Sequence, residues 1–121
     1  MFGLGLNTGK QAEDIAAKYL QSQGYKIVAR NYRCKGGEID LICSCDKMLV
    51  FVEVRHRTSS HFGSGADTVS TNKQRKITLA ANIYLLEKYG DRPPACRFDV
   101  ISTDGPTFKI DWLKNAFGDF S

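Results

Sequence analysis

The sequence predicts an α/β (α+β) domain in which one helix is followed by three strands, a second helix and two further strands. Two stretches carry apolar residues at the i, i+3, i+4, i+7 spacing of an amphipathic helix. Five shorter stretches are rich in alternating or β-branched apolar residues and are bounded by glycine or polar turns. A chain of 121 residues has the length of one domain, so we expect residues 1–121 to fold as a single unit.

The first helix is predicted from Thr8 to Gln23, with Gly24 as its stop. Its apolar stripe consists of Ala12, Ile15, Ala16, Tyr19 and Leu20. Glu13 lies at the edge of this stripe, whereas Asp14 points to the opposite side. Glu13 therefore either compensates the helix dipole in the first turn or leans toward a site on the neighbouring sheet, and the sequence favours neither.

Three strands are predicted next. The first runs from Tyr25 to Tyr32 and leaves through a basic, glycine-containing turn. The second and third, Gly37–Ile42 and Leu49–Arg57, flank the short polar turn Ser44–Lys47. Because this turn is short, the two strands are expected to form an antiparallel hairpin.

Acidic residues interrupt both strands of the predicted hairpin. Side chains alternate between faces with period two, so Glu38 and Asp40 share one face of the first hairpin strand. Glu53 likewise shares a face of the next strand with Arg55 and Arg57. Carboxylates inside apolar runs are costly to bury unless they are paired or bound to a cation. The hairpin therefore predicts a metal site or an ion-pair cluster.

The second half of the chain begins with a long Ser, Thr and Gly-rich loop, Thr58–Val69, beside the candidate site. His61 in this loop is a possible proton carrier, although a lone loop histidine is usually just solvent-exposed. Thr71 and Gln74 fit a capping box, which starts a second helix that ends at Tyr89 and Gly90. Lys73 lies on the inward side of its first turn.

Two more strands complete the predicted fold, at Cys96–Ser102 and Thr107–Leu113. Phe108, Ile110 and Trp112 are expected on one face of the last strand. The tail Lys114–Ser121 is expected to form a turn or a frayed helix.

Charge and cysteine usage limit the class of protein. Lysine and arginine outnumber aspartate and glutamate by 17 to 13, and the excess falls before residue 36 and between residues 61 and 92. This suits a polyanionic partner, although a solvated basic surface explains the charge equally simply. The sequence contains no signal peptide and no run of membrane-spanning length, so we expect a cytoplasmic protein with free thiols. The cysteine spacing matches no common zinc pattern.

The order of elements, with Asp40 on the second strand and Glu53-Val54-Arg55 on the third, resembles the core of restriction-endonuclease-like, PD-(D/E)xK nucleases. The chain also resembles the YraN-like uncharacterised protein family 0102 of small bacterial proteins, whose relatives look like Holliday-junction resolvases. That second resemblance rests on Gly37–Ile42, Phe51–Arg57, Lys73 and Arg97–Val100. Together they imply a restriction-endonuclease-like α-β-β-β-α-β core with a mixed central sheet flanked by helices.

The resemblance implies a site for Mg²⁺ or Mn²⁺, with Asp40, Glu53 and the Val54 carbonyl as ligands. Its catalytic residues would be Glu13, Asp40, Glu53, Arg55 and Lys73. This sequence departs from the nuclease pattern because Arg55 stands where a lysine is usual. Arginine is effectively never deprotonated, so Arg55 is expected to clamp a phosphate rather than act as a base. Lys73 is expected to replace the missing lysine.

Three functions follow as hypotheses. The first, which the resemblance implies, is a metal-dependent endonuclease or resolvase that hydrolyses phosphodiesters in structured DNA, in DNA repair or recombination. The alternative is a non-catalytic nucleic-acid-binding module of nuclease ancestry. The third is a structural role in which Asp40 and Glu53 pair with Arg55 and Arg57 across the hairpin.

Nucleic acid, and DNA in particular, is the expected partner in the first two hypotheses. The basic residues expected to contact phosphates are Lys10, Lys18, Arg30, Arg33, Lys35, Arg57, Arg75 and Lys76. A homodimer is also plausible, since cutting a junction needs two paired sites.

Overall fold

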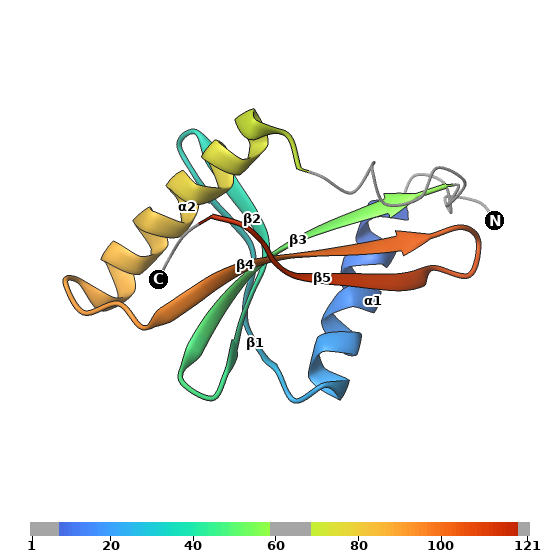
Figure 1. The fold of residues 1–121 in the computed structure, drawn as a ribbon, viewed down its shortest axis with the longest axis horizontal. Coiled ribbons are helices and arrows are strands. Elements are labelled where there is room, and N and C mark those ends of the chain that lie inside the picture. Colours follow the sequence, from blue (N-terminus) through green and yellow to red (C-terminus); the bar gives the residue numbers. More distant parts are fainter. Residues whose placement is uncertain (1–7, 59–68, 119–121) are drawn as a thin grey trace.

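The computed structural model describes residues 8–58 and 69–118, and its elements follow the predicted order (Figure 1). The fold is α+β. Its elements are α1 (Thr8–Ser22), β1 (Lys26–Cys34), β2 (Gly37–Cys45), β3 (Met48–Arg57), α2 (Thr71–Tyr89), β4 (Ala95–Asp104) and β5 (Lys109–Phe117).

The five strands form one mixed sheet in the order β1-β2-β3-β4-β5. The hairpin prediction is confirmed, because β2 and β3 pair antiparallel from Leu41 opposite Val52 to Cys45 opposite Met48. β3 and β4 are parallel and are connected through α2, whereas β5 returns antiparallel to β4. The arrangement is consistent with a restriction-endonuclease-like core.

A hydrophobic core lies on each face of the sheet, so the molecule has three layers with α1 and α2 on opposite faces (Figure 1). Within β3, Phe51 packs in the cluster that contains α2, and its neighbour Val50 packs in the cluster that contains α1. Burial on both faces explains why the central strands are almost continuous apolar runs. Because both faces are buried, the side chain of a charged residue in these strands points into one of the two hydrophobic cores.

The start of α2 differs from the predicted capping box by one residue. Ser70, not Thr71, is the N-cap, and its hydroxyl accepts a hydrogen bond from the Lys73 N–H at 3.1 Å. The Gln74 side chain donates to the Val69 carbonyl at 2.7 Å instead of reaching back to Thr71. Serine and threonine cap equally well by type. The buried Val69 fixes where the chain enters the helix, and the sequence alone does not show this tertiary contact.

The prediction for the tail was wrong between residues 114 and 117, because β5 continues to Phe117. Asn115 has a positive φ of 53°, and the pairing of β4 with β5 is irregular between Phe98 and Val100. Trp112 packs in the α1-side core, whereas Phe117 packs on the α2 side against Phe98. Two polar residues, Lys114 and Asn115, interrupt the apolar pattern before Phe117, which hides the end of the strand in the sequence.

Phe108 also differs from expectation. It lies in the turn before β5, with a φ of 54°, and its ring stacks on His56 at 4.4 Å between centroids. Most of the predicted loop, including His61, lies outside the described residues. Neither of the helices in the described ranges is long and apolar enough to cross a membrane.

Candidate functional site

A cavity of about 530 Å³ lies between the tip of the β1–β2 hairpin, the middle of β3 and the first turns of α2. The hairpin contributes Arg33, Cys34, Gly36, Gly37, Glu38 and Asp40 to its lining. β3 contributes Glu53 and Val54, and α2 contributes Lys73, Lys76 and Ile77. Acidic and basic side chains from three elements therefore share one recess.

Gly37 allows the hairpin to approach α2 closely enough to form this recess. A Cβ atom at Gly37 would lie 2.3 Å from the Lys76 carbonyl oxygen and 3.2 Å from the Ala80 Cβ. A backbone oxygen at that distance cannot yield without moving the helix or the hairpin. Gly36 adds a positive φ of 89° at the tip. The paired glycines are the sequence signal for this wall, although the sequence pattern places them only in the turn and at the start of the second strand.

Asp40 and Glu53 meet in the cavity, as the sequence predicts. The regular pairing of β2 with β3 ends at Leu41 opposite Val52, so Asp40 and Glu53 are the next opposed positions, where side chains share a face. Glu53 is only 5% exposed. The Val54 N–H donates to Asp40 Oδ2 at 2.9 Å.

Burial and the neighbouring Glu53 together raise the pKa of Asp40 to about 7. Burial is the larger cause, repulsion by the Glu53 charge is next, and the Val54 N–H opposes both. Contact with the Glu53 carboxyl and the more distant charge of Glu13 raise it further. The Lys73 Nζ forms an ion pair with Glu53 Oε2. Negative charge is thus concentrated at this pair of carboxyl groups, and the Lys73 ammonium lies beside it.

Glu13 lies on α1 and is not among the residues that line the cavity. Its carboxylate accepts hydrogen bonds from Arg30 at 2.7 Å and from Asn31 at 3.0 Å. Within the described part of the chain, Glu13 therefore influences Asp40 through its charge rather than by contact with the cavity.

The two candidates for the missing lysine are placed differently. Arg55 follows Glu53 by two residues on β3 and does not line the described cavity. Lys73 lines the cavity and contacts Glu53, with its side chain 53% exposed. The ammonium group that reaches the carboxylates therefore comes from α2.

The basic residues that were predicted to contact phosphates do not all lie together in the structure. Arg33 and Lys76 line the cavity, and Lys35 lies at the exposed hairpin tip between two lining residues. Arg75 is exposed next to Lys76 and donates to Asn72 at 3.1 Å. These four residues share the hairpin tip and the start of α2.

The other four lie elsewhere. Lys10 and Lys18 are exposed on α1, and Arg30 pairs with Glu13 and with Asp14 on the same side. Arg57 is held at the end of β3 by Asp104, to which its Nη2 donates at 2.8 Å. The structure therefore does not bring these cations to the cavity.

Among the described residues, no group of three or more His, Cys, Asp or Glu side chains is placed to hold a metal ion. The available donors are the carboxylates of Asp40 and Glu53 and the backbone of Val54. The N–H and C=O of one strand residue point to the same side, so the Val54 carbonyl faces the side on which its N–H meets Asp40. These hard oxygen donors suit Mg²⁺, which binds proteins through one or two carboxylates and keeps several waters.

A family model described as "Uncharacterised protein family UPF0102" matches residues 12–103, a range that contains the whole cavity lining. The chain belongs to the UPF0102 family. A UPF0102 protein of Janthinobacterium sp. (strain Marseille) is 51% identical over 108 residues, which cover 89% of this chain and 85% of the relative. One from Hahella chejuensis is 49% identical over 117 residues, covering 93% and 90%. One from Ralstonia pickettii is 49% identical over 115 residues, covering 92% and 90%.

Proposed function

We propose that this UPF0102 protein is a Mg²⁺- or Mn²⁺-dependent endonuclease that hydrolyses phosphodiesters in structured DNA, with a role in DNA repair or recombination. One observation carries the proposal: Asp40 and Glu53 are in contact in a cavity whose lining also presents Arg33, Lys73 and Lys76. Two carboxyl groups with surplus negative charge suit a divalent cation, and the lining cations suit a phosphate backbone.

The ion would be held by Asp40, Glu53 and the Val54 carbonyl. When bound, it would supply charge compensation at the scissile phosphate and activate a water for attack. The raised pKa of Asp40 supports this assignment, because a cation relieves the repulsion that holds a proton on the carboxyl group.

The chain's own cations would position the substrate. Lys73 contacts Glu53 from a largely exposed position, so its ammonium can turn to a phosphate oxygen beside the carboxylates. Arg33 and Lys76 would hold neighbouring phosphates on either wall. None of the lining residues in the described part of the chain is aromatic, so these residues offer no platform for base stacking. Recognition would therefore depend on the backbone and the shape of the DNA.

Structured DNA fits the recess better than a regular duplex. Glu53 is almost fully buried, so the carboxylates are reached only from within the recess. A strand that has left its duplex at a branch or a break can enter between the hairpin tip and α2.

A non-catalytic nucleic-acid-binding module is the second candidate, and one observation favours it. The Lys73 ammonium already pairs with Glu53, and Arg55 does not line the cavity. The same recess would then hold phosphates without turnover. In both cases binding should weaken steeply as salt rises and depend little on base sequence.

Single-turnover cleavage of a branched DNA in Mn²⁺ tests the proposal. The wild type should cut only with the ion, and Asp40→Asn should cut at least about a hundredfold more slowly. Asp91→Asn, a charge-matched change at an exposed position after α2, should cut like the wild type. If Asp40→Asn cuts as fast as the wild type, the activity is a contaminant and the nuclease proposal fails. If nothing cuts while salt-sensitive binding persists, the binding module is the correct description.

A further inference from the structure

The outer side of α2 carries a second apolar stripe that the fold covers only in part, because Leu79 lies near Gly36 at the hairpin tip and Leu86 is open to solvent. Leu79, Ile83 and Leu86 have the i, i+4, i+7 spacing that places side chains in one row along a helix. Leu86 is 69% exposed, more than any other large hydrophobic side chain in the described residues, and Leu79 is 43% exposed. Single exposed leucines are ordinary, but a row of them on one helix is not.

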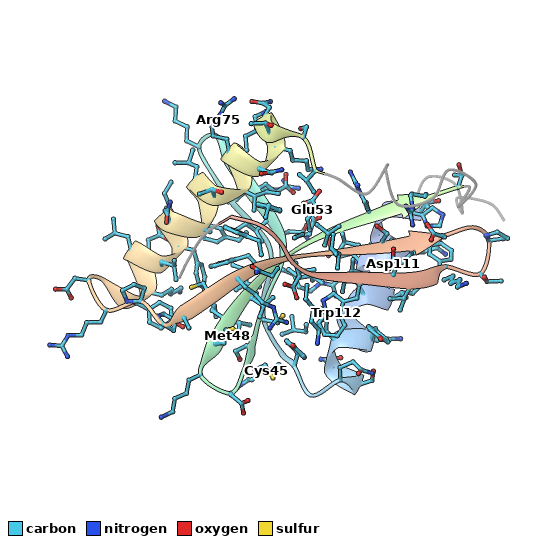
Figure 2. The ribbon with its side chains drawn as sticks, in the orientation of Figure 1. Cys45, Met48, Glu53, Arg75, Asp111 and Trp112 are labelled. Carbon is cyan, nitrogen blue, oxygen red and sulfur yellow. The ribbon has the colours of Figure 1, made fainter. Side chains whose placement is uncertain are left out.

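This outer stripe faces away from the sheet. The inner side of α2 packs on the sheet through Ile77, Ala81 and Tyr84, so the helix is apolar on two sides. α2 lies at the margin of the molecule, and Arg75, one turn before Leu79, extends away from the sheet (Figure 2). A helix that is apolar on both sides is normally covered on both sides.

We propose that the outer stripe of α2 binds the same stripe of a second copy, with the two helices antiparallel about a two-fold axis between Asn82 and Ile83. In this register Leu79 lies opposite the partner's Leu86, and the contact occurs twice by symmetry. Asn82 lies opposite the partner's Ile83 at the centre. The pairing buries the two most exposed leucines of the helix together.

Charge selects the second copy and the antiparallel direction. Lys76 and Glu87 lie on the same flank of the stripe, near its opposite ends. The antiparallel register places Lys76 beside the partner's Glu87, again twice, whereas in a parallel pair this flank of one helix lies on the opposite side of the interface from the same flank of its partner and the contact is not made. The Tyr32 hydroxyl donates to Glu87 Oε1 at 2.7 Å, which holds this carboxylate in place and leaves its other oxygen for the contact.

The interface would reach the rim of the cavity, because Lys76 also lines it. Two cavities would then be fixed in one assembly, as cleavage of both strands at a branch requires. The pairing itself does not rest on the proposed nuclease function, and its test uses no activity.

Sedimentation equilibrium of the full chain over a range of concentrations tests the pairing. The wild type should be a dimer, and Leu86→Lys should raise the dimer dissociation constant by about a hundredfold or more. Leu113→Lys is the matched control, because Leu113 is 47% exposed on the edge strand β5. It should leave the dimer intact. Circular dichroism melting should show that each variant remains folded.

A charge exchange tests the direction. Lys76→Glu should weaken the dimer about tenfold, since it puts two carboxylates together, and the double variant Lys76→Glu/Glu87→Lys should restore it. A double variant that is no better than the single one would overturn the antiparallel register. A wild type that is monomeric at every concentration would overturn the proposal, whatever else covers the stripe. If Leu113→Lys abolishes the dimer and Leu86→Lys does not, the proposal is wrong and the dimer forms through the edge strand β5.

Discussion

Two acidic residues in the sheet of this protein, the buried Asp99 and the half-buried Asp40, have opposite surroundings. Asp99 is 1% exposed and accepts four hydrogen bonds, from Arg97 at 2.9 and 3.1 Å and from the Trp112 indole and the Asn115 N–H at 2.9 Å. Asp40 receives one N–H, from Val54, and lies against a second carboxyl group, Glu53. Buried carboxylates with a full set of donors are parts of the fold, whereas those with a deficit of positive charge are candidates for chemistry.

The partners of Asp99 explain its role. Arg97 also donates to the Tyr25 hydroxyl at 2.7 Å, and the Tyr25 ring lies 5.2 Å from that of Trp112. The cluster ties β5 to β4 and to the segment after α1, and it lines no part of the cavity. The proposed function therefore rests on Asp40 and Glu53 and not on Asp99.

The largest expected effect is the loss of stability on removing Asp99. Asp99→Ala leaves the Arg97 guanidinium and the Trp112 N–H without their acceptor, which should cost about 3 kcal/mol or more of the free energy of unfolding. Asp40→Ala should cost much less, because it removes a charge that is already unfavourable. Urea denaturation of the two variants measures both values. Equal losses would show that Asp40 is as structural as Asp99.

The second effect concerns Lys73, whose ammonium contacts Glu53. Lys73→Met should lower single-turnover cleavage by about a hundredfold while leaving Mn²⁺ affinity nearly unchanged, because it removes a positioned charge but no ligand. Arg55→Lys should change cleavage and phosphate binding little, since Arg55 does not line the described cavity. Calorimetric Mn²⁺ titration separates ligand loss from catalytic loss. If Arg55→Lys and Lys73→Met fall equally, the roles assigned to the two positions are wrong.

Much of this contrast was predictable from the sequence. Period two placed Asp40 and Glu53 on facing positions of a hairpin, and the structure brings them together as predicted. Helical spacing placed Lys73 inward, where it reaches Glu53. Local periodicity is sufficient to predict the placement of these residues. Each lies in a regular helix or strand that packs against an element close to it in the sequence.

Other features required the tertiary fold. Asp99 sits in a strand pattern much as Asp40 does, and only the irregular turn of β5 at Asn115 brings its backbone N–H to the carboxylate. The sequence pattern places Gly37 only in the turn and at the start of the second strand, yet its role is the contact with α2, nearly forty residues away in the sequence. Such contacts depend on how the helices pack against the sheet, and a local sequence pattern does not predict that packing.

The third effect is the pH dependence of ion binding. Since the pKa of Asp40 is raised to about 7, an ion must displace a proton at lower pH. Mn²⁺ affinity should therefore fall about tenfold per pH unit below pH 7 and level off above it. Calorimetry between pH 5 and 8 measures the slope. An affinity that stays constant across this range would show that Asp40 is ionised throughout and that the repulsion from Glu53 is already neutralised.

The fourth effect is the most discriminating, because the two roles open to Asp40 predict changes in stability of opposite sign. The pKa of Asp40 is about 7 in the folded chain and near 3.8 without the fold, so the folded state binds more protons between these values. Its contribution to stability is therefore most favourable below pH 4 and is lost as pH rises toward 7. Asn cannot ionise, so Asp40→Asn should be more stable than the wild type above pH 7, by about 1.4 kcal/mol for each pKa unit by which the fold raises Asp40. The difference should vanish near pH 4. If Asp40 instead served as the anion of a structural ion pair, the same variant would be less stable at neutral pH and the difference would grow with pH. Thermal unfolding at pH 4 and pH 8, without divalent ions, distinguishes the two cases because they differ in direction and not only in size.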